Sequence, residues 1–225
     1  MFGGVMAEQL AFNMDCLEAM RSMPDKAFDL AVVDPVYGGV TQGGYMKNLD
    51  STTKLAKPIQ YNLAIWGQPK TGKEYFSELF RVSKNSIVWG GNYFVEEINR
   101  NSQCWIVWDK QNTGGFADFE MAWTSFDSAS RIFRFTWNGM LQEDMKNKEV
   151  RIHPTQKPVA LYKWILSRYA KPGDKILDTH LGSGSSRIAA YDLGFDFVGY
   201  EIDKEYFDKQ EERFAKHTAQ LDLFH

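Results

Sequence analysis

The chain of 225 residues contains little cysteine and no long apolar run. Its two cysteines, Cys16 and Cys104, are too few for a disulfide framework or a four-cysteine zinc site, which favours a reducing cytoplasm. No apolar stretch approaches the roughly 20 residues that span a bilayer, and the N-terminus lacks the charged start and apolar segment of a signal peptide. The sequence therefore predicts a cytoplasmic protein that does not enter a membrane.

Histidine and net charge are also scarce. His153 has no second histidine or paired cysteine at metal-ligand spacing, so we expect no metal. The net charge of −3 excludes a chain that is strongly basic throughout. Residues 131–157 nevertheless carry six basic and three acidic side chains, a local net charge of six minus three, or +3. This segment can face phosphates, although a solvated connecting segment explains the same charge.

The chain does contain alternating strand-like and helix-like segments. With 44% apolar and 24% charged residues it is typical of one soluble globular domain, residues 1–225. The alternation predicts an α/β fold with a mainly parallel, doubly wound sheet, whose ligands bind beyond the carboxyl ends of the strands. Strands are expected at 28–34, 86–89, 104–108, 120–126, 175–178 and 195–201, and helices at 15–23, 73–82, 158–170, 185–193 and 203–218.

A short motif, Asp34-Pro35-Val36-Tyr37, ends the first buried strand. An exocyclic amine of a nucleobase is a poor nucleophile, because its lone pair is delocalised into the ring. The Asp34 carboxylate and the Pro35 carbonyl can accept its two N–H bonds and orient it for attack, while Tyr37 offers a face on which a rotated base can stack. The motif therefore predicts methylation of an amino group. Its alternative is a simple strand-ending turn.

A second strand ends in a glycine loop. Gly182 and Gly184 leave out side chains where a ligand approaches the backbone, and Asp178 can pair with the ammonium group of a methionine moiety. Glu201, at the end of the next strand, can accept hydrogen bonds from ribose hydroxyls. Arg187 occupies the position of the third glycine in a dinucleotide-binding motif. The loop thus favours S-adenosylmethionine, with an NAD-dependent oxidoreductase as the weaker alternative.

The order of these motifs is informative, because the glycine loop follows the Asp34 motif by more than a hundred residues instead of preceding it. This order indicates a circularly permuted sheet. Segments at 13–17, 34–37, 153–158, 178–186 and 197–202, of which His-Pro-Thr-Gln-Lys-Pro at 153–158 is the most specific, resemble motifs of the beta class of DNA amino-methyltransferases of phages and bacteria. The resemblance covers most of the chain and implies a Rossmann-like methyltransferase fold, S-adenosylmethionine as cofactor and double-stranded DNA as substrate.

The resemblance also implies the site residues. Asp34, Pro35 and Tyr37 would be catalytic. The cofactor pocket would be formed by Asp15, Thr155, Lys157, Asp178, Gly182, Ser183, Gly184, Ser185 and Glu201.

In that family an aspartate at the first motif position favours adenine N6 over cytosine N4. Three residues depart from the family pattern: Val36 replaces a proline, Thr179 a proline and His180 a phenylalanine. The alternatives are an N4-cytosine enzyme, an RNA-directed enzyme, or a catalytically weak nucleic-acid-binding subunit that needs a partner.

Target recognition is expected in a small insertion at about 131–150, too short to read a long site. Dimerisation, as in relatives, would assist it. The predicted contacts to DNA are Arg131, Arg134, Lys146, Lys148 and Arg151. The neighbouring segment 117–123 resembles a family strand, and its aromatic side chains, with Trp105 and Trp108, are expected in the core.

Residues 219–225 are expected to form a flexible tail. Gln220-Leu221-Asp222-Leu223-Phe224 resembles the pentapeptide by which bacterial replication proteins bind the sliding clamp, with Gln220, Leu221, Leu223 and Phe224 as the contacts. The alternative is that Leu221 and Phe224 pack against the protein's own sheet.

Overall fold

A computed structural model of the chain describes residues 7–38, 70–111, 117–138 and 141–222. Residues 38–58, whose Gly, Thr, Asn and Lys content predicts a long loop, lie almost entirely outside the described residues. Within the described part of the chain, no helix is long and apolar enough to cross a membrane. The same residues contain no group of three or more His, Cys, Asp or Glu side chains that could hold a metal ion.

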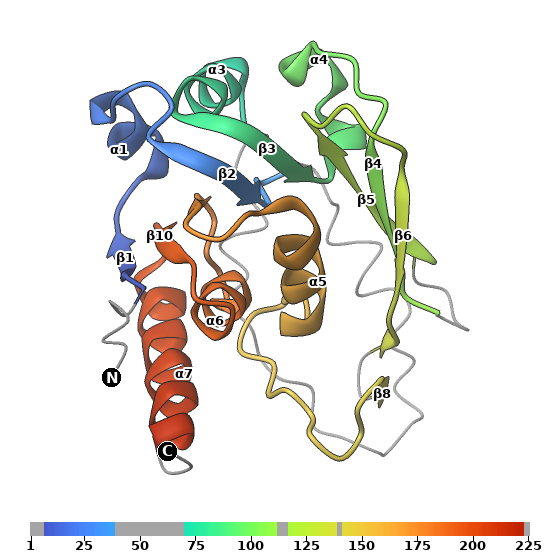
Figure 1. The fold of residues 1–225 in the computed structure, drawn as a ribbon, viewed down its shortest axis with the longest axis vertical. Coiled ribbons are helices and arrows are strands. Elements are labelled where there is room, and N and C mark those ends of the chain that lie inside the picture. Colours follow the sequence, from blue (N-terminus) through green and yellow to red (C-terminus); the bar gives the residue numbers. More distant parts are fainter. Residues whose placement is uncertain (1–6, 39–69, 112–116, 139–140, 223–225) are drawn as a thin grey trace.

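An eight-stranded sheet forms the centre of the molecule, in the order β1-β10-β9-β2-β3-β5-β4-β6 (Figure 1). The strands from β1 to β3 are parallel, β5 is antiparallel to both of its neighbours, and β6 is parallel to β4. The predicted α/β fold with a mainly parallel, permuted sheet is therefore confirmed. The strands are β1 (Gln9–Asn13), β2 (Phe28–Val33), β3 (Ser83–Trp89), β4 (Trp105–Asp109), β5 (Phe119–Thr124), β6 (Arg131–Arg134), β9 (Lys175–Asp178) and β10 (Asp196–Glu201), and a separate hairpin contains β7 (Trp137–Asn138) and β8 (Leu141–Gln142).

Helices cover both faces of this sheet. Figure 1 shows α1, α3 and α4 on one side and α5 and α6 on the other. Residues of β2 alternate between the two cores: Val32 packs in the core with α5 and α6, and Val33 in the core with α1 and α3. Burial on both faces explains why β2 is apolar along its length. The helices are α1 (Cys16–Ser22), α3 (Lys73–Val82), α4 (Val95–Ile98), α5 (Val159–Tyr169), α6 (Ser185–Asp192) and α7 (Lys204–Asp222), with a 3-10 turn η2 (Gly91–Tyr93).

Two predicted boundaries are wrong. Residues 131–134 form β6 in the main sheet beside β4, so an insertion outside the sheet can begin only after Arg134. The last helix continues to Asp222, which places residues 219–222 in α7 and not in a tail. Ion pairs between residues four apart, such as Lys204–Asp208 and Glu212–Lys216, support this long charged helix.

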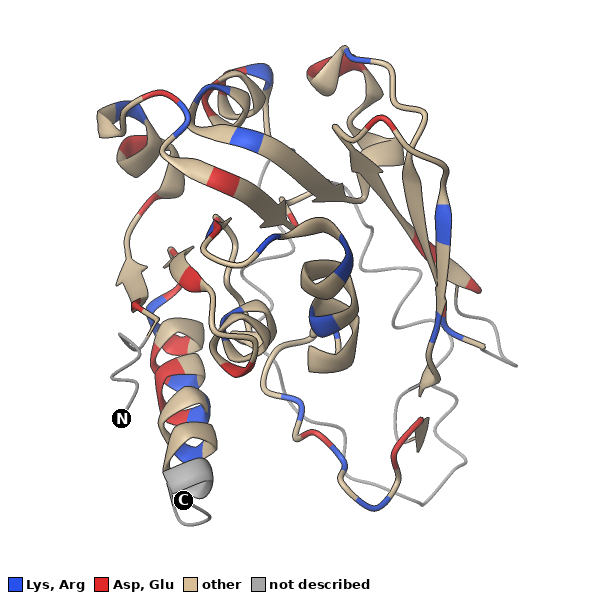
Figure 2. Ribbon diagram, viewed as in Figure 1, with Lys and Arg blue, Asp and Glu red and all other residues tan. Residues whose placement is uncertain are grey.

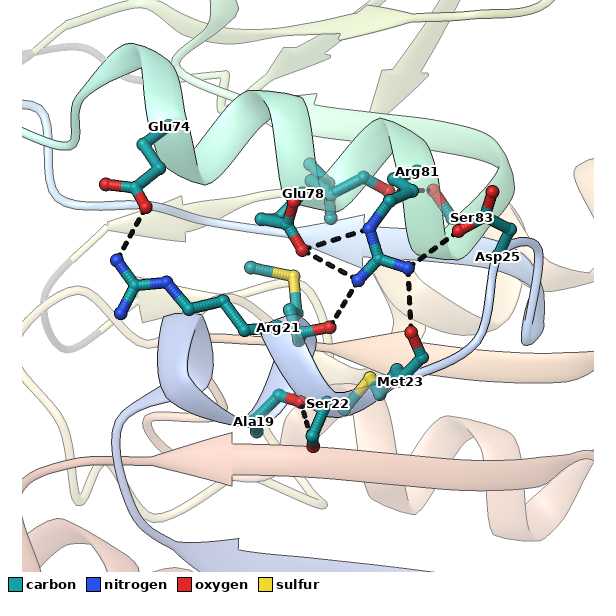
Figure 3. Close-up of polar contacts among 11 residues, drawn as sticks. Ala19, Arg21, Ser22, Met23, Asp25, Glu74, Glu78, Arg81 and Ser83 are labelled. Atoms are coloured by element: carbon teal, nitrogen blue, oxygen red, sulfur yellow. Dashed lines mark hydrogen bonds and ion pairs between the residues drawn. The ribbon is translucent and has the colours of Figure 1, made fainter.

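Arg81 at the end of α3 connects α3 to α1 (Figure 3). Its guanidinium donates to the backbone carbonyls of Met20 at 2.6 Å and Met23 at 2.7 Å, and it pairs with the carboxylates of Glu78 and Asp25. Met20 lies in the last turn of α1, where its carbonyl also accepts from the Met23 N–H at 3.0 Å, and Met23 is the C-cap residue of that helix. Arg81 therefore holds α1 against α3, and with it the N-terminus of α1 at the edge of the sheet.

Candidate active site

The two predicted loops meet because their strands are neighbours. Strands β2 and β9 are parallel, with Leu30 opposite Ile176, so the Asp34 motif and the glycine loop leave the sheet at the same edge. Strand β10 pairs with β9 on the other side and ends at Glu201. A cavity of about 230 Å³ lies at this edge. The predicted site residues that line it are Asp15, Asp34, Pro35, Tyr37, Thr155, Lys157, Gly182, Ser183 and Glu201.

The carboxylate of Asp34 is held by two donors. The Tyr37 hydroxyl donates to Oδ1 at 2.9 Å, and the Lys157 ammonium donates to Oδ2. Burial and the nearby Asp34 raise the pKa of Tyr37 well above its usual value, so the hydroxyl stays protonated as a donor. The two contacts fix the carboxylate at the wall of the cavity.

Lys157 is the centre of a buried charge network. Its side chain is only 3% exposed, and its Nζ lies 3.2 Å from Glu120 Oε2 and 5.3 Å from the centre of the Trp89 ring. Burial alone would lower the pKa of Lys157, but the carboxylates of Asp34 and Glu120 raise it above its usual value. Lys157 is therefore a permanent cation beside the Asp34 motif.

Glu120 was not predicted as a site residue. It lies on β5 and contacts the ammonium groups of both Lys157 and Lys110. Burial alone would raise its pKa, but these two cations hold the pKa below its usual range. An acidic residue within the apolar strand 119–124 was a signal in the sequence that a charged partner lies opposite.

The ring of Tyr37 belongs to an aromatic stack that sequence reasoning also missed. It stacks on Tyr93 with ring centres 5.1 Å apart. The Tyr37 and Phe94 rings meet in an edge-to-face arrangement with their centres 6.1 Å apart. Gly90 has a φ of +65°, and a Cβ at this position would lie 2.4 Å from the Tyr37 ring. Tyr93 is 54% exposed, so the stack runs from the cavity wall to the surface. The stack is an aromatic surface suited to a rotated base.

Only part of the glycine loop faces the cavity. Gly182 lines it, has a φ of +52°, and donates its N–H to Glu201 Oε2 at 2.8 Å. Gly184 and Ser185 do not line the cavity. A Cβ at Gly184 would lie 3.1 Å from Gln210 Oε1 in α7, and the Ser185 hydroxyl accepts from Arg213 at 2.9 Å. These two residues dock the loop onto α7.

Asp178 is also inside the protein and not at the cavity wall. Its carboxylate accepts from the Ser186 hydroxyl at 2.5 Å and from the His180 N–H at 3.0 Å. Burial raises its pKa to about 7. Asp178 therefore hydrogen-bonds two other residues of the segment 178–186. Its predicted pairing with an ammonium group stays a prediction.

Glu201 and Asp15 both face the cavity and both have a backbone role. Glu201 accepts from the N–H of Asp203 at 2.9 Å as well as from Gly182, which fixes its carboxylate but leaves further lone pairs for a ligand. Asp15 is the N-cap of α1 and accepts from the N–H groups of Leu17 and Glu18. The family resemblance implied only a place in the cofactor pocket for Asp15, and its role as an N-cap was not predicted.

The two departures from the family pattern in the glycine loop are part of one hydrogen-bond chain. The Tyr75 hydroxyl lies 2.5 Å from Thr179 Oγ1, which lies 2.9 Å from His180 Nδ1. Burial lowers the pKa of His180 to about 4, so its ring is neutral at pH 7. Thr179 and His180 thus each have a hydrogen-bond partner that proline or phenylalanine could not bind. Thr155, which also lines the cavity, has its Oγ1 3.1 Å from His153 Nδ1.

The predicted DNA contacts lie away from the cavity wall. Figure 2 shows basic residues on β6 and along the segment between β8 and α5. Arg131, Arg134, Lys146 and Lys148 are exposed, whereas Arg151 is half-buried over the Trp137 ring at 4.7 Å. Of the predicted clamp contacts, Gln220 and Leu221 lie in α7, and Leu223 and Phe224 lie outside the described residues.

Two curated relatives resemble this chain along most of its length. It is 39% identical over 251 aligned positions to the type II methyltransferase M2.DpnII of Streptococcus pneumoniae, covering 91% of this chain and 92% of that protein. It is 28% identical to the type II methyltransferase M.HinfI of Haemophilus influenzae, covering 88% of this chain, and it spans 66% of that longer protein.

Solved structures share the fold. The M1.HpyAVI complex with S-adenosylmethionine is 20% identical, with a TM-score of 0.55 over 91% of this chain and 98% of that chain. The cytosine-N4-specific PvuII DNA methyltransferase is 12% identical, with a TM-score of 0.59 over 97% and 94%. The family model described as DNA methylase, for N6 and N4 enzymes, matches residues 95–212. Together with the M2.DpnII identity, this match shows that the chain belongs to the N6/N4 family of DNA methylases.

Proposed function

We propose that this chain transfers a methyl group from S-adenosylmethionine to the N6 amine of adenine in double-stranded DNA. The observation that carries the proposal is the place of Asp34, whose carboxylate lies on the cavity that Gly182 and Glu201 also line. Family membership supports the class of reaction, since the model covers N6 and N4 DNA methylases. The amine acceptor and the cofactor-binding loop are thus within one site.

The residues present fit S-adenosylmethionine. The fixed carboxylate of Glu201 can accept hydrogen bonds from ribose hydroxyls, and Met14 and Ile202 give the same part of the cavity an apolar lining for the adenine ring. Gly182 keeps the loop backbone open to a ligand. When bound, the cofactor supplies an activated methyl group on a cationic sulfur. The M1.HpyAVI structure was solved as a complex with this cofactor.

The chain's own residues orient the amine. The Asp34 carboxylate and the Pro35 carbonyl accept the two N–H bonds of the amino group, which directs the nitrogen lone pair at the methyl carbon. The N–C bond would form as the C–S bond breaks, which leaves a neutral thioether, and the proton that the nitrogen then loses would pass to solvent water. Tyr37 and Tyr93 present the aromatic surface on which a base rotated out of the helix stacks.

Asp34 at the first motif position favours adenine, as the family resemblance implies. Cytosine N4 is the alternative within the same family, and the PvuII enzyme of similar fold is specific for it. The exposed basic residues of β6 and of the segment after β8 are proposed to contact the phosphates of the duplex.

Mass spectrometry of nucleosides tests both reaction and target. Unmethylated bacterial DNA is incubated with the protein and S-adenosylmethionine that carries an isotopically labelled methyl group, and is then digested. We expect label in N6-methyladenine. Label in N4-methylcytosine would overturn the choice of base but keep the reaction class. No label in DNA, with cofactor binding measured in the same sample, would overturn the proposed activity.

A further inference from the structure

We infer that Glu120 is a positioning residue for methyl transfer, acting through Lys157 on the acceptor carboxylate of Asp34. The inference rests on the proposed function, and it gives a role to a strand, β5, that supplies none of the motif residues. Glu120 does not line the cavity, so it acts on the reaction only through its neighbours.

The contacts form an alternating series of charges. Lys110 pairs with Glu120, Glu120 with Lys157 at 3.2 Å, and Lys157 with Asp34. The Lys157 ammonium thus has carboxylates on two sides and the Trp89 ring 5.3 Å from it. It is 3% exposed, whereas Glu120 is 28% and Lys110 is 18% exposed. Glu120 therefore gives the Lys157 ammonium a second carboxylate partner besides Asp34.

The charge of this network bears on the reaction, because the attacking amine nitrogen becomes positive as the N–C bond forms. A negative environment at Asp34 stabilises that charge. If Lys157 paired with Asp34 alone, its positive charge would cancel the negative charge of the aspartate. The negative charge of Glu120 offsets the positive charge of Lys157. The four groups, two carboxylates and two ammoniums, sum to zero. Neutralising Glu120 leaves the set at +1, and neutralising Lys110 leaves it at −1.

These opposite signs separate an electrostatic role from a purely structural one. Glu120→Gln and Lys110→Met both break the Lys110–Glu120 pair, but they change the charge near Asp34 in opposite directions. We expect Glu120→Gln to lower kcat by roughly 10- to 100-fold, less than the loss of a group that touches the reacting atoms. We expect Lys110→Met to raise kcat. The double variant restores a net charge of zero and recovers most of the lost rate.

The experiment is single-turnover methyl transfer with the full chain, at saturating S-adenosylmethionine and DNA. The dissociation constant of S-adenosylmethionine and the Tm are measured for each variant and are expected to stay near wild type. Asp192→Asn is the matched control. Asp192 also bridges two basic side chains, with its carboxylate 2.7 Å from Lys163 Nζ and 2.6 Å from His217 Nε2, and is 11% exposed, but it lies outside the cavity lining.

Opposite effects of the two single variants, with recovery in the double variant and a wild-type rate for Asp192→Asn, support the inference. A Lys110→Met rate at or below the wild-type rate overturns it, as does an Asp192→Asn loss equal to that of Glu120→Gln. Absence of transfer by the wild-type protein itself is a different result, which overturns the proposed function on which the inference rests.

Discussion

The ammonium of Lys157 binds the carboxylate of Asp34, although 123 residues separate them in the chain. Lys157 belongs to the segment before α5, and Asp34 follows β2, so this contact joins the two halves of the permuted sheet at the cavity. Lys157 is buried and Asp34 is half-buried, and each charge compensates the other. The contact places Lys157 beside the proposed acceptor of the amine, whereas the sequence implied only a cofactor role for it.

Asp34→Ala is expected to lose methyl transfer by about a thousandfold or more while it keeps S-adenosylmethionine binding, because the acceptor of the amine is removed and Gly182 and Glu201 are unchanged. Methyl incorporation and equilibrium cofactor binding check the two halves of this prediction. Asp29→Ala is the control at the opposite end of β2, where Asp29 pairs with Lys84 at 2.5 Å. It should lower stability and leave kcat unchanged. An Asp34→Ala enzyme with wild-type turnover would contradict the catalytic assignment.

Gly90→Ala is expected to disturb Tyr37. The new Cβ would lie 2.4 Å from the Tyr37 ring, and the φ of +65° is unfavourable for alanine. Gly173→Ala is a matched control, since its φ is +88° but no atom lies within 4 Å of the added Cβ. Both variants should lose about 1 kcal/mol of stability from backbone strain. Only Gly90→Ala should also lose methyl transfer, and equal activities would show that the Tyr37 contact does not matter.

The sequence predicted those site residues that follow the ends of parallel strands. Asp34 stands directly after β2, Gly182 in the loop that follows β9, and Glu201 at the end of β10, so recognising the strands was enough to bring the residues together. Glu120 was missed because it comes from β5, a strand antiparallel to both of its neighbours, whose approach to the site the parallel pattern does not predict. No local pattern encodes that pairing.

Asp15 and Asp178 were both predicted to bind the cofactor, and the structure shows contacts within the protein for each that were not predicted. Asp15 faces the cavity and also caps α1, and Asp178 binds Ser186 and the backbone of His180 beneath the loop. The sequence carries both possibilities, because short carboxylates serve equally as caps and as ligands. Strand β6 was missed for another reason: it has four residues and exposed charged ends, so it lacks an apolar run.

Arg81→Met is expected to lower the Tm more than Arg21→Met. Arg81 donates to the backbone carbonyls of Met20, in the last turn of α1, and of Met23, its C-cap, and its removal leaves them without that donor. Arg21 joins the same two helices only through an exposed pair with Glu74 at 2.5 Å, and such pairs contribute little. Thermal unfolding of the two variants makes the comparison, and equal Tm values would contradict a special role for Arg81.

Asp178 should make the stability of the cofactor-free protein depend on pH. Burial raises its pKa from an ordinary 3.8 to about 7 in the folded protein, so the folded state binds this proton more tightly than the unfolded state. Stability contributed by Asp178 is therefore lost as the pH rises from about 4 to about 7, with a slope of at most ~1.4 kcal/mol per pH unit. Asp178→Asn removes this dependence.

The measurement is urea unfolding of wild type and Asp178→Asn between pH 5 and 8. Burial lowers the pKa of His153 and of His180 to about 4, which gives both proteins an opposing rise in stability up to about pH 6.5. Subtracting the two curves cancels that rise. The Asp178→Asn advantage should increase up to about pH 7 and then level off. For Asp29→Asn, whose carboxyl pKa is lowered by Lys84, the difference from wild type should stay constant across this range. A constant difference for Asp178→Asn as well would show that Asp178 is ionised in the folded protein.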